Sequence, residues 1–315
     1  MVAPSSSKST ANPLRSVRVG RRTIRITHPD KILFPETGIT KGEIVDYYHR
    51  VAPVMLPHLR GRPVMLQRLP EGLGGPVFYQ KQISSYFPDW IHRTTVTKQG
   101  GTVTHVVCDD AATLVYLANQ GCLTPHVWLS RADDPDRPDR MIIDLDPSTD
   151  DVADVRFAAG AARELLTEAG LQPYLMATGS RGFHVVVPLR RAAAFDEVRA
   201  VARGLADALA ARAPDRLTTA GRKADRGDRV YLDVLRNAYA ATAVPAYAVR
   251  PRSAAPVAVP LDWDELESAN PDGWTVRTVL DRLDRTPDPW RGFTRRARSL
   301  EAARRWLRRN EGSRS

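Results

Sequence analysis

The hydrophobic and polar positions of residues 141–236 predict a regular succession of strands and helices. Short apolar runs at 141–146, 172–178, 183–189 and 229–235 have the length and the β-branched content of strands. Two longer segments, 152–170 and 195–212, repeat apolar residues with the period of a helix. The order is β-α-β-β-α-β, the ferredoxin-like (RRM-like) arrangement. In that fold the first and last strands are neighbours in an antiparallel sheet, one central and the other at the edge.

The region before this core has a mixed α/β pattern. Thr40 and Glu43 have the spacing of a capping box, and an amphipathic helix is expected to follow them. Residues 93–107 alternate on both sides of two glycines and predict a hairpin. We therefore expect an α+β protein with a basic flank at each end. Its expected segments are a flexible basic arm (1–22), a main domain (23–290) and a basic tail (291–315). The main domain is expected to consist of an N-terminal subdomain (23–139), a catalytic core (140–250) and a C-terminal cap (251–290).

The flanks are polar and basic. The first 20 residues have no acid and suit a flexible arm, although a transit peptide has similar composition. Residues 291–315 are rich in arginine, and Glu301 and Glu311 are their only acids. They predict a short basic helix or a frayed tail, which either contacts phosphates or is a solvated surface.

Composition narrows the class of protein. The 315 residues are 43% hydrophobic, enough for one large or two smaller folded domains. No apolar run has the length of a membrane span, no secretory signal is present, and the two cysteines suit a reducing cytosol. The net charge of +10 and the pI of about 9.9 indicate a polyanionic partner, most simply nucleic acid, although an arginine-rich genome would give the same balance.

Two aspartates interrupt the apolar strand 141–146. Side chains two residues apart on a strand point to the same face, about 7 Å apart, so Asp144 and Asp146 face one way while Ile143 and Leu145 face the helices. Asp233 interrupts the strand predicted to lie beside this one. Three neighbouring carboxylates repel one another unless cations lie between them. Their oxygen atoms suit Mg²⁺ or Mn²⁺, so we expect a divalent metal site.

The turn at 177–184 adds donors beside this site. Gly179 and Gly182 permit a tight turn with exposed backbone N–H groups, and Ser180, Arg181 and His184 can donate to anionic oxygens. Alone, this sequence would be an ordinary hairpin turn, but beside three aspartates it suits a triphosphate. Together the two features predict nucleotidyl transfer with two metal ions.

The motif order resembles the archaeo-eukaryotic primase superfamily, and more closely the polymerase domain of bacterial ligase D, in a stand-alone form. The motifs are D-L-D at 144–146, T-G-S-R-G-F-H at 178–184 and the single strand aspartate at 233. The segments 27–48, 61–72 and 124–128 are also similar, and the resemblance covers about residues 23–285. It implies the primase fold and a DNA-dependent polymerase that also takes ribonucleotides and favours Mn²⁺ over Mg²⁺, with two ions bound.

The resemblance also implies roles for individual residues. Asp144, Asp146 and Asp233 would be the metal ligands and catalytic residues. The nucleotide would contact Thr178, Ser180, Arg181, Gly182, His184 and Arg250. The DNA 5′-phosphate would contact Lys31 and Lys41, and the template would stack on Phe78 and Tyr79, which could instead be core residues. Active-site neighbours would be His126 and Arg226.

The family further implies partners and a location. The implied partners are DNA with gaps or double-strand breaks and a 5′-phosphate, ribo- or deoxyribonucleoside triphosphates, the Ku end-binding protein and a separate ATP-dependent DNA ligase. No membrane is expected among them. The implied location is the bacterial cytoplasm, at the nucleoid. The segment 223–227 (KADRG) is similar to a ligase nucleophile motif, but an arginine separates its aspartate from its glycine. Gln67, Arg181 and Arg236 depart from residues common in relatives, and Gln67 would weaken a 5′-phosphate contact.

Three alternatives share some of these residues. A primase that starts chains de novo would use the same site, but the lysine pair favours end joining. A non-catalytic DNA-end binder that recruits a ligase would not need three clustered carboxylates. A metal-dependent nuclease would not need the nucleotide-binding turn.

Overall fold

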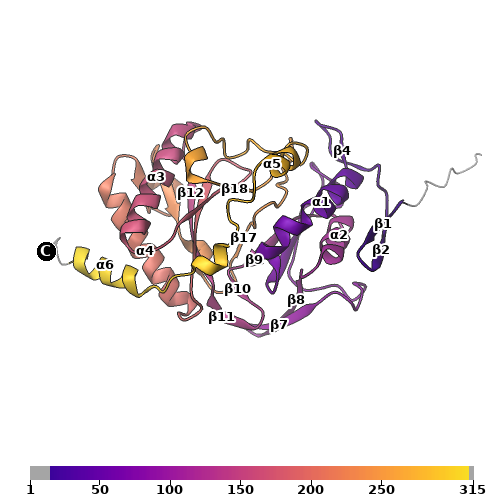
Figure 1. The fold of residues 1–315 in the computed structure, drawn as a ribbon, viewed down its shortest axis with the longest axis horizontal. Coiled ribbons are helices and arrows are strands. Elements are labelled where there is room, and N and C mark those ends of the chain that lie inside the picture. Colours follow the sequence, from indigo (N-terminus) through magenta and orange to yellow (C-terminus); the bar gives the residue numbers. More distant parts are fainter. Residues whose placement is uncertain (1–14, 312–315) are drawn as a thin grey trace, which may run out of the picture.

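Two β-sheets lie side by side in the computed structural model, which describes residues 15–311 (Figure 1). The N-terminal sheet and its helices lie on the right of the view, and the catalytic sheet with its helices lies on the left. The catalytic sheet has the order β15 (Leu217–Thr218), β16 (Val230–Asp233), β12 (Arg140–Asp146), β14 (Phe183–Pro188), β13 (Tyr174–Ala177), β18 (Val259–Leu261). The N-terminal sheet has the order β17 (Thr242–Ala243), β9 (Cys122–Trp128), β5 (Pro63–Arg68), β8 (Gly101–Val107), β7 (Arg93–Lys98), with β6 (Phe78–Gln80) paired to β5.

The catalytic sheet contains the predicted β-α-β-β-α-β unit. Its four strands lie in the order β16, β12, β14, β13, all antiparallel, and the helices α3 (Val152–Glu168) and α4 (Phe195–Arg212) pack against it. One detail of the prediction is wrong, because β16 is not the edge strand. The two-residue strand β15 pairs with it in parallel and covers its outer side.

The N-terminal subdomain is built around the predicted helix. In α1 (Lys41–Leu59), Thr40 and Glu43 form the expected capping box, and the helix packs on α2 (Ala111–Asn119). The predicted hairpin is β7 and β8, with Gly100 at φ +76° in its turn. The remaining short strands are β3 (Ile32–Phe34), β4 (Ile39–Thr40), β10 (Ser130–Arg131) and β11 (Asp134–Pro138).

The basic arm predicted for residues 1–22 is too long. The strands β1 (Arg15–Val19) and β2 (Arg22–Ile26) form an antiparallel hairpin, and Val19, Ile24 and Ile26 of this hairpin are buried. Arginines alternate with the apolar residues of these strands. They give the segment the composition of a basic tail although its spacing is that of a strand. Residues 1–14 lie outside the described residues, so the rest of that prediction is untested.

The C-terminal region also packs more closely than the predicted cap and tail. Strand β18 completes the catalytic sheet, and α5 (Val279–Arg285) follows it. The segment predicted as a tail buries Phe293, Leu300 and Trp306, and it forms α6 (Glu301–Glu311) against α4. Within residues 15–311, no helix has both the length and the apolar content needed to span a membrane.

Candidate active site

The three predicted aspartates meet at the junction of β12 and β16. Asp144 lies directly opposite Asp233 in the antiparallel pair, and Asp146 lies two residues further along β12. One carboxylate oxygen from each of the three lies within 4.8 Å of the others. Asp144 is buried, and the other two are half-buried. The sheet register therefore places three oxygen ligands at one point, as the sequence pattern predicted.

The charges at this point are unbalanced. Burial and the neighbouring carboxylates Asp144 and Asp233 raise the pKa of Asp146 to about 6. Burial opposes ionisation of Asp144 as well, but His184 at 3.4 Å and Arg236 at 3.5 Å outweigh it and lower the pKa of Asp144. Clustered oxygen donors that repel one another suit a hard divalent cation, so these residues fit Mg²⁺ or Mn²⁺.

The turn between β13 and β14 depends on its two glycines. Gly179 adopts φ +65°, and a Cβ there would lie 2.7 Å from Cγ of Arg250 and 2.8 Å from the carbonyl carbon of Val257. A Cβ on Gly182 would lie 2.0 Å from the carbonyl oxygen of Leu145, in the strand that bears the aspartates. Thr178 closes the turn, since its hydroxyl and its N–H both donate to the carbonyl of Gly182, at 2.7 and 3.2 Å. Gly182 thus lets the turn lie against the strand of the aspartates, and Gly179 lets it lie against Val257.

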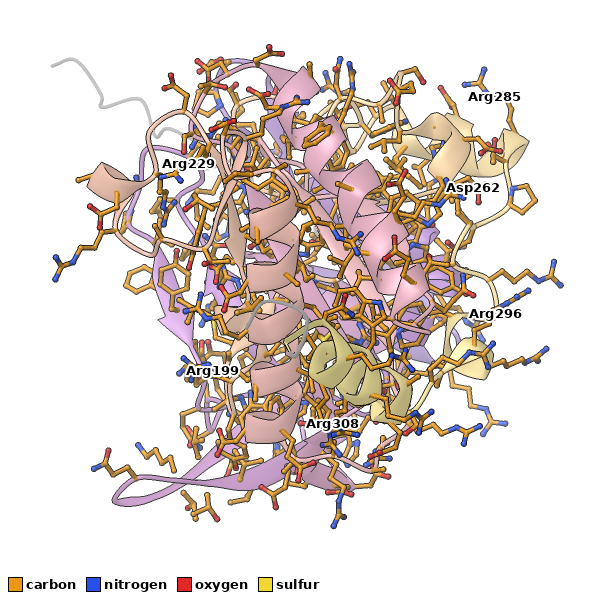
Figure 2. All side chains as sticks on the ribbon, turned by 90° about the vertical axis from the view of Figure 1, so that its left-hand side faces the viewer. Arg199, Arg229, Asp262, Arg285, Arg296 and Arg308 are labelled. Carbon is orange, nitrogen blue, oxygen red and sulfur yellow. The ribbon has the colours of Figure 1, made fainter. Side chains whose placement is uncertain are left out.

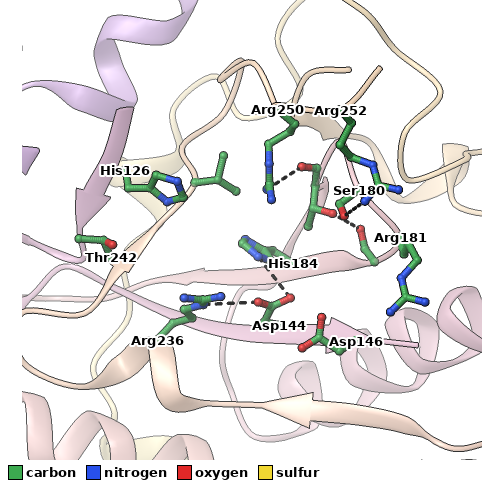
Figure 3. A pocket seen from close by; sticks show the side chains of 13 residues that line it. His126, Asp144, Asp146, Ser180, Arg181, His184, Arg236, Thr242, Arg250 and Arg252 are labelled. Atoms are coloured by element: carbon green, nitrogen blue, oxygen red, sulfur yellow. Dashed lines mark hydrogen bonds and ion pairs between the residues drawn. The ribbon is translucent and has the colours of Figure 1, made fainter. Parts of the chain in front are cut away.

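A polar cavity of about 320 Å³ opens between this turn and the aspartates (Figure 3). Arg250 donates to the carbonyl of Thr178 at 3.1 Å, and Arg252 donates to the hydroxyl of Ser180 at 3.1 Å. The size is in the range of small-ligand sites, and clustered guanidinium groups favour an anionic ligand. The cavity is lined by His126, Asp144, Asp146, Thr178, Ser180, Arg181, Gly182, His184, Arg236, Thr242, Val244, Arg250 and Arg252.

The N-terminal sheet contributes one wall of this cavity. His126 lies on β9, and its Nε2 is 3.1 Å from Oε1 of Gln67. Burial and the charges of Arg250 and Arg236 lower the pKa of His126 to about 3, so its imidazole is neutral at physiological pH. Thr242 lies on β17, which pairs with β9 although it comes directly after the strand β16 of the catalytic sheet in sequence.

Four of these lining residues were not among the predicted contacts. Arg236 was noted only as a departure from relatives, and Arg252, Thr242 and Val244 were not singled out. The spacing of Arg250 and Arg252 around Pro251 is a weak signal for two arginines at one site. Nothing in the sequence places Thr242 and Val244 at the cavity, because that depends on the pairing of the two sheets.

The two predicted phosphate-binding lysines do not line the cavity but lie together in the N-terminal subdomain. The N–H of Lys41 donates to the carbonyl of Lys31 at 2.8 Å. The Lys41 ammonium is buried and donates to the carbonyl and the hydroxyl of Thr27, at 2.6 and 2.8 Å. Burial and the charge of Lys31 lower the pKa of Lys41 to about 8. Lys31 itself forms an ion pair with Glu71 at 2.6 Å.

The predicted aromatic pair is at the surface. Phe78 and Tyr79 on β6 are 52% and 64% exposed, which excludes the core-packing alternative for both rings. The Tyr79 hydroxyl is 3.3 Å from Nε2 of Gln67, whose other amide atom contacts His126. A chain of contacts therefore joins the exposed Tyr79 to the cavity wall.

Arg226 is separate from the cavity. It lies over the ring of Tyr231 at 3.8 Å, and it donates to the carbonyls of Ala220 and Gly221. Tyr231 lies opposite Asp146 in the sheet, so Arg226 is near the aspartates through this ring without lining the cavity.

The sequence of this chain is similar to part of the LigD proteins of other bacteria. Residues 40–290 match the family model of the LigD primase-polymerase domain. The multifunctional non-homologous end joining protein LigD of Mycolicibacterium smegmatis is 36% identical over 270 residues, which are 84% of this chain and 35% of that protein. The bifunctional non-homologous end joining protein LigD of Bacillus subtilis is 32% identical over 275 residues, 86% of this chain and 44% of that protein. The chain thus spans between a third and a half of the length of these relatives.

A solved structure has the same fold. The polymerase domain of Mycobacterium tuberculosis ligase D, in complex with DNA, superposes with a TM-score of 0.82 at 32% identity, and the match covers 87% of this chain and 99% of that one. This agreement confirms the expected primase fold, and with the family match it confirms the resemblance seen in the motifs. The chain belongs to the LigD primase-polymerase domain family.

Proposed function

We propose that this chain is a DNA-directed nucleotidyltransferase that adds nucleotides to a primer 3′-hydroxyl at gaps or broken ends, in bacterial non-homologous end joining. The observation that carries the proposal is the meeting of three carboxylates within 4.8 Å beside a cavity lined by four arginines. The carboxylates suit metal ions, and the arginines suit a triphosphate. A polymerase needs both at one place.

The residues of the chain have distinct parts in this reaction. Bound to Asp144, Asp146 and Asp233, two Mn²⁺ or Mg²⁺ ions would supply the charge that activates the 3′-hydroxyl and stabilises the pyrophosphate leaving group. His184 and Arg236 hold Asp144 ionised, and so keep it ready as a ligand. Arg181, Arg250 and Arg252, with the turn at 178–182, bind and orient the triphosphate. His126 contributes a neutral imidazole at the opposite wall.

The N-terminal subdomain would recognise the DNA. Lys31 and Lys41 lie together and could bind a 5′-phosphate from one side, while Phe78 and Tyr79 present exposed rings for template bases. This lysine pair favours end recognition over de novo priming, which needs no 5′-phosphate. The further partners in this proposal are ribo- or deoxyribonucleoside triphosphates, the Ku protein and a separate ATP-dependent ligase, in the bacterial cytoplasm.

The test uses a gapped duplex with a 5′-phosphate, Mn²⁺ and either ATP or dATP. We expect Asp146→Asn to reduce nucleotide addition by at least about a thousandfold, because the substitution removes a ligand charge without changing the size of the side chain. Asp207→Asn removes the same charge from an exposed position on α4 and should leave the rate unchanged. The ATP-to-dATP ratio gives the sugar preference.

Other outcomes would support the rival functions. Addition that starts without a primer, at a rate equal to primer extension, would favour a primase. Tight binding of the gapped duplex with no addition under either metal would favour a non-catalytic end binder, and loss of nucleotides from the primer would favour a nuclease.

A further inference from the structure

The arginine-rich segment 291–311 lies beyond the range that the family model matches, residues 40–290. It contains eight arginines and two glutamates. The cavity and the proposed DNA-end contacts use none of these residues. The segment is therefore a feature of this chain that the proposed active site does not explain.

The helix of this segment is fixed to the catalytic core by its apolar side. Leu300, Ala303 and Trp306 recur every three residues and are 5%, 0% and 7% exposed. Leu307 lies against Gly204 in the middle of α4, where a Cβ would be 3.1 Å from Cδ1 of the leucine. Glycine is disfavoured inside a helix, so its presence here is best explained by the close approach of α6.

Polar contacts hold α6 on both sides of this crossing. Arg304 forms an ion pair with Glu197, at the start of α4, at 2.7 Å. At the other end of α4, Arg212 lies over the ring of Trp306 at 5.6 Å and pairs with Glu168 of α3. The helix is thus a fixed part of the fold, so its outward arginines are held in place before any partner arrives.

Arginines predominate on the outward side of the segment, where Glu301 is also exposed but pairs with Arg304. Arg305 and Arg308 of α6 are exposed one helical turn apart, and Arg295 and Arg296 are exposed just before the helix. Within the described chain, none of these four arginines is in an ion pair. Figure 2 shows α6 in front of the helices of the catalytic core, with Arg308 and Arg296 at the surface.

A polyanion fits this surface better than an acidic protein does. The large exposed hydrophobic side chains of the described residues are Ile32, Val77, Phe78, Tyr79, Tyr86, Leu235 and Tyr239, and none of them lies in 291–311. Protein interfaces have an apolar centre, which this surface lacks, whereas DNA can be bound through phosphate contacts alone. Arginine suits phosphate because its planar group donates two parallel hydrogen bonds.

The part of this surface on α6 is remote from the cavity. Helix α4 packs against β12, whose aspartates point into the cavity, and α6 packs on α4. The helical layer therefore separates α6 from the cavity where the triphosphate is proposed to bind. At physiological salt, charges are screened over about 8 Å, so Arg305 and Arg308 act on their own ligand and not on the reaction.

We propose that the basic surface formed by Arg295, Arg296, Arg305 and Arg308 is a second DNA-binding site. It binds the phosphate backbone of duplex DNA without regard to sequence or to DNA ends. The part of a duplex held by Arg305 and Arg308 lies on the helical side of the catalytic sheet, away from the cavity. This site could hold the flanking duplex, or the second end, while the first end is being extended.

The experiment measures binding to a covalently closed duplex circle, which has no ends, in EDTA and without nucleotide. The variant Arg305→Gln/Arg308→Gln removes two outward charges and leaves the apolar side of α6 unchanged. We expect a loss of about tenfold or more in affinity at low salt, and a plot of log K against log salt that is shallower by about 2. The control Arg163→Gln/Arg285→Gln removes two charges from exposed positions on α3 and α5, and its plot should match that of the wild type.

A second variant tests whether the surface needs its fixed position. Gly204→Leu keeps every arginine and favours the helix α4, but its side chain takes the place of Leu307. We expect it to bind the closed circle as weakly as the double arginine variant, and wild-type binding would contradict a built site. Gap filling on a short gapped duplex should be unchanged in Arg305→Gln/Arg308→Gln, which separates this proposal from the proposed polymerase function.

Two results would overturn the DNA assignment. One is an unchanged salt slope in Arg305→Gln/Arg308→Gln, or an equal decrease in the control pair. The other is binding of poly-glutamate that depends on Arg305 and Arg308 while binding of the closed circle does not, which would assign the surface to an acidic protein.

Discussion

The two ends of strand β12 bury carboxylates in opposite surroundings. Just before the strand, Asp139 accepts hydrogen bonds from Arg62 at 2.6 Å and from Arg131 at 2.8 Å, and Arg140 lies 3.4 Å away. Burial alone would raise the pKa of Asp139, but the charges of Arg62 and Arg140 outweigh burial and hold that pKa well below its usual range. This carboxylate is ionised because its own fold supplies the opposite charges.

At the other end of the strand, Asp146 faces other carboxylates. The pKa of Asp146 is raised to about 6 by burial and by Asp144 and Asp233. The difference teaches how to tell a structural buried charge from a functional one. A structural charge is neutralised inside the protein, whereas a functional charge remains unbalanced until its ligand arrives.

The largest expected effect is on the free energy of unfolding, when the same Asp→Asn substitution is made at each end of β12. Asp139→Asn leaves the buried Arg62 and its neighbours around a neutral amide, and it should lower the free energy of unfolding by about 3–5 kcal/mol. Asp146→Asn removes a repulsive charge, and in EDTA it should leave that free energy unchanged or raise it. Urea unfolding followed by circular dichroism measures both. Equal destabilisation by the two substitutions would contradict the distinction between the two ends.

A smaller effect is expected from metal binding to the folded protein. Mn²⁺ should stabilise the wild type by about 2.7 kcal/mol at a concentration a hundred times its dissociation constant, because it binds the folded state and relieves the repulsion. Asp146→Asn should lose most of this gain, and Asp207→Asn should keep it. The measurement is the melting temperature with Mn²⁺ and with EDTA. A wild-type melting temperature that does not respond to Mn²⁺ would mean that the aspartates are not a metal site.

The sequence predicted the aspartate cluster because its geometry follows from short-range rules. The alternation within 141–146 sets the face of Asp144 and Asp146, and the order of strands and helices sets β16 beside β12. Gly179 and Gly182 were singled out for the same reason, since a tight turn between adjacent strands needs them. All of these inferences use only the local pattern and one fold rule.

What the sequence could not predict depends on packing between distant segments. Thr242 reaches the cavity because β17 pairs with the N-terminal sheet, which no local pattern specifies. The hairpin of β1 and β2 was misread as part of a basic arm, and the helix α6 was predicted only as one of two alternatives, for a different reason. Their apolar positions, such as Val19, Ile24 and Trp306, have strand and helix spacing, but the arginines between them dominate the composition.

The smallest expected effect concerns a third buried charge, Lys41. Its ammonium contacts only neutral oxygens of Thr27, and no ion pair involving Lys41 occurs within residues 15–311, so like the aspartates it is unbalanced. Its pKa of about 8 lies below the ordinary value for lysine, so raising the pH through 8 removes the charge from the folded protein. The preference for a 5′-phosphate over a 5′-hydroxyl on a gapped duplex should therefore fall by about tenfold between pH 7 and pH 9. Lys41→Arg should abolish this fall, because arginine stays protonated in that range. If the preference of the wild type does not change with pH, Lys41 does not bind the 5′-phosphate. Of the two predicted lysines, only Lys31 would then remain as a candidate for that contact.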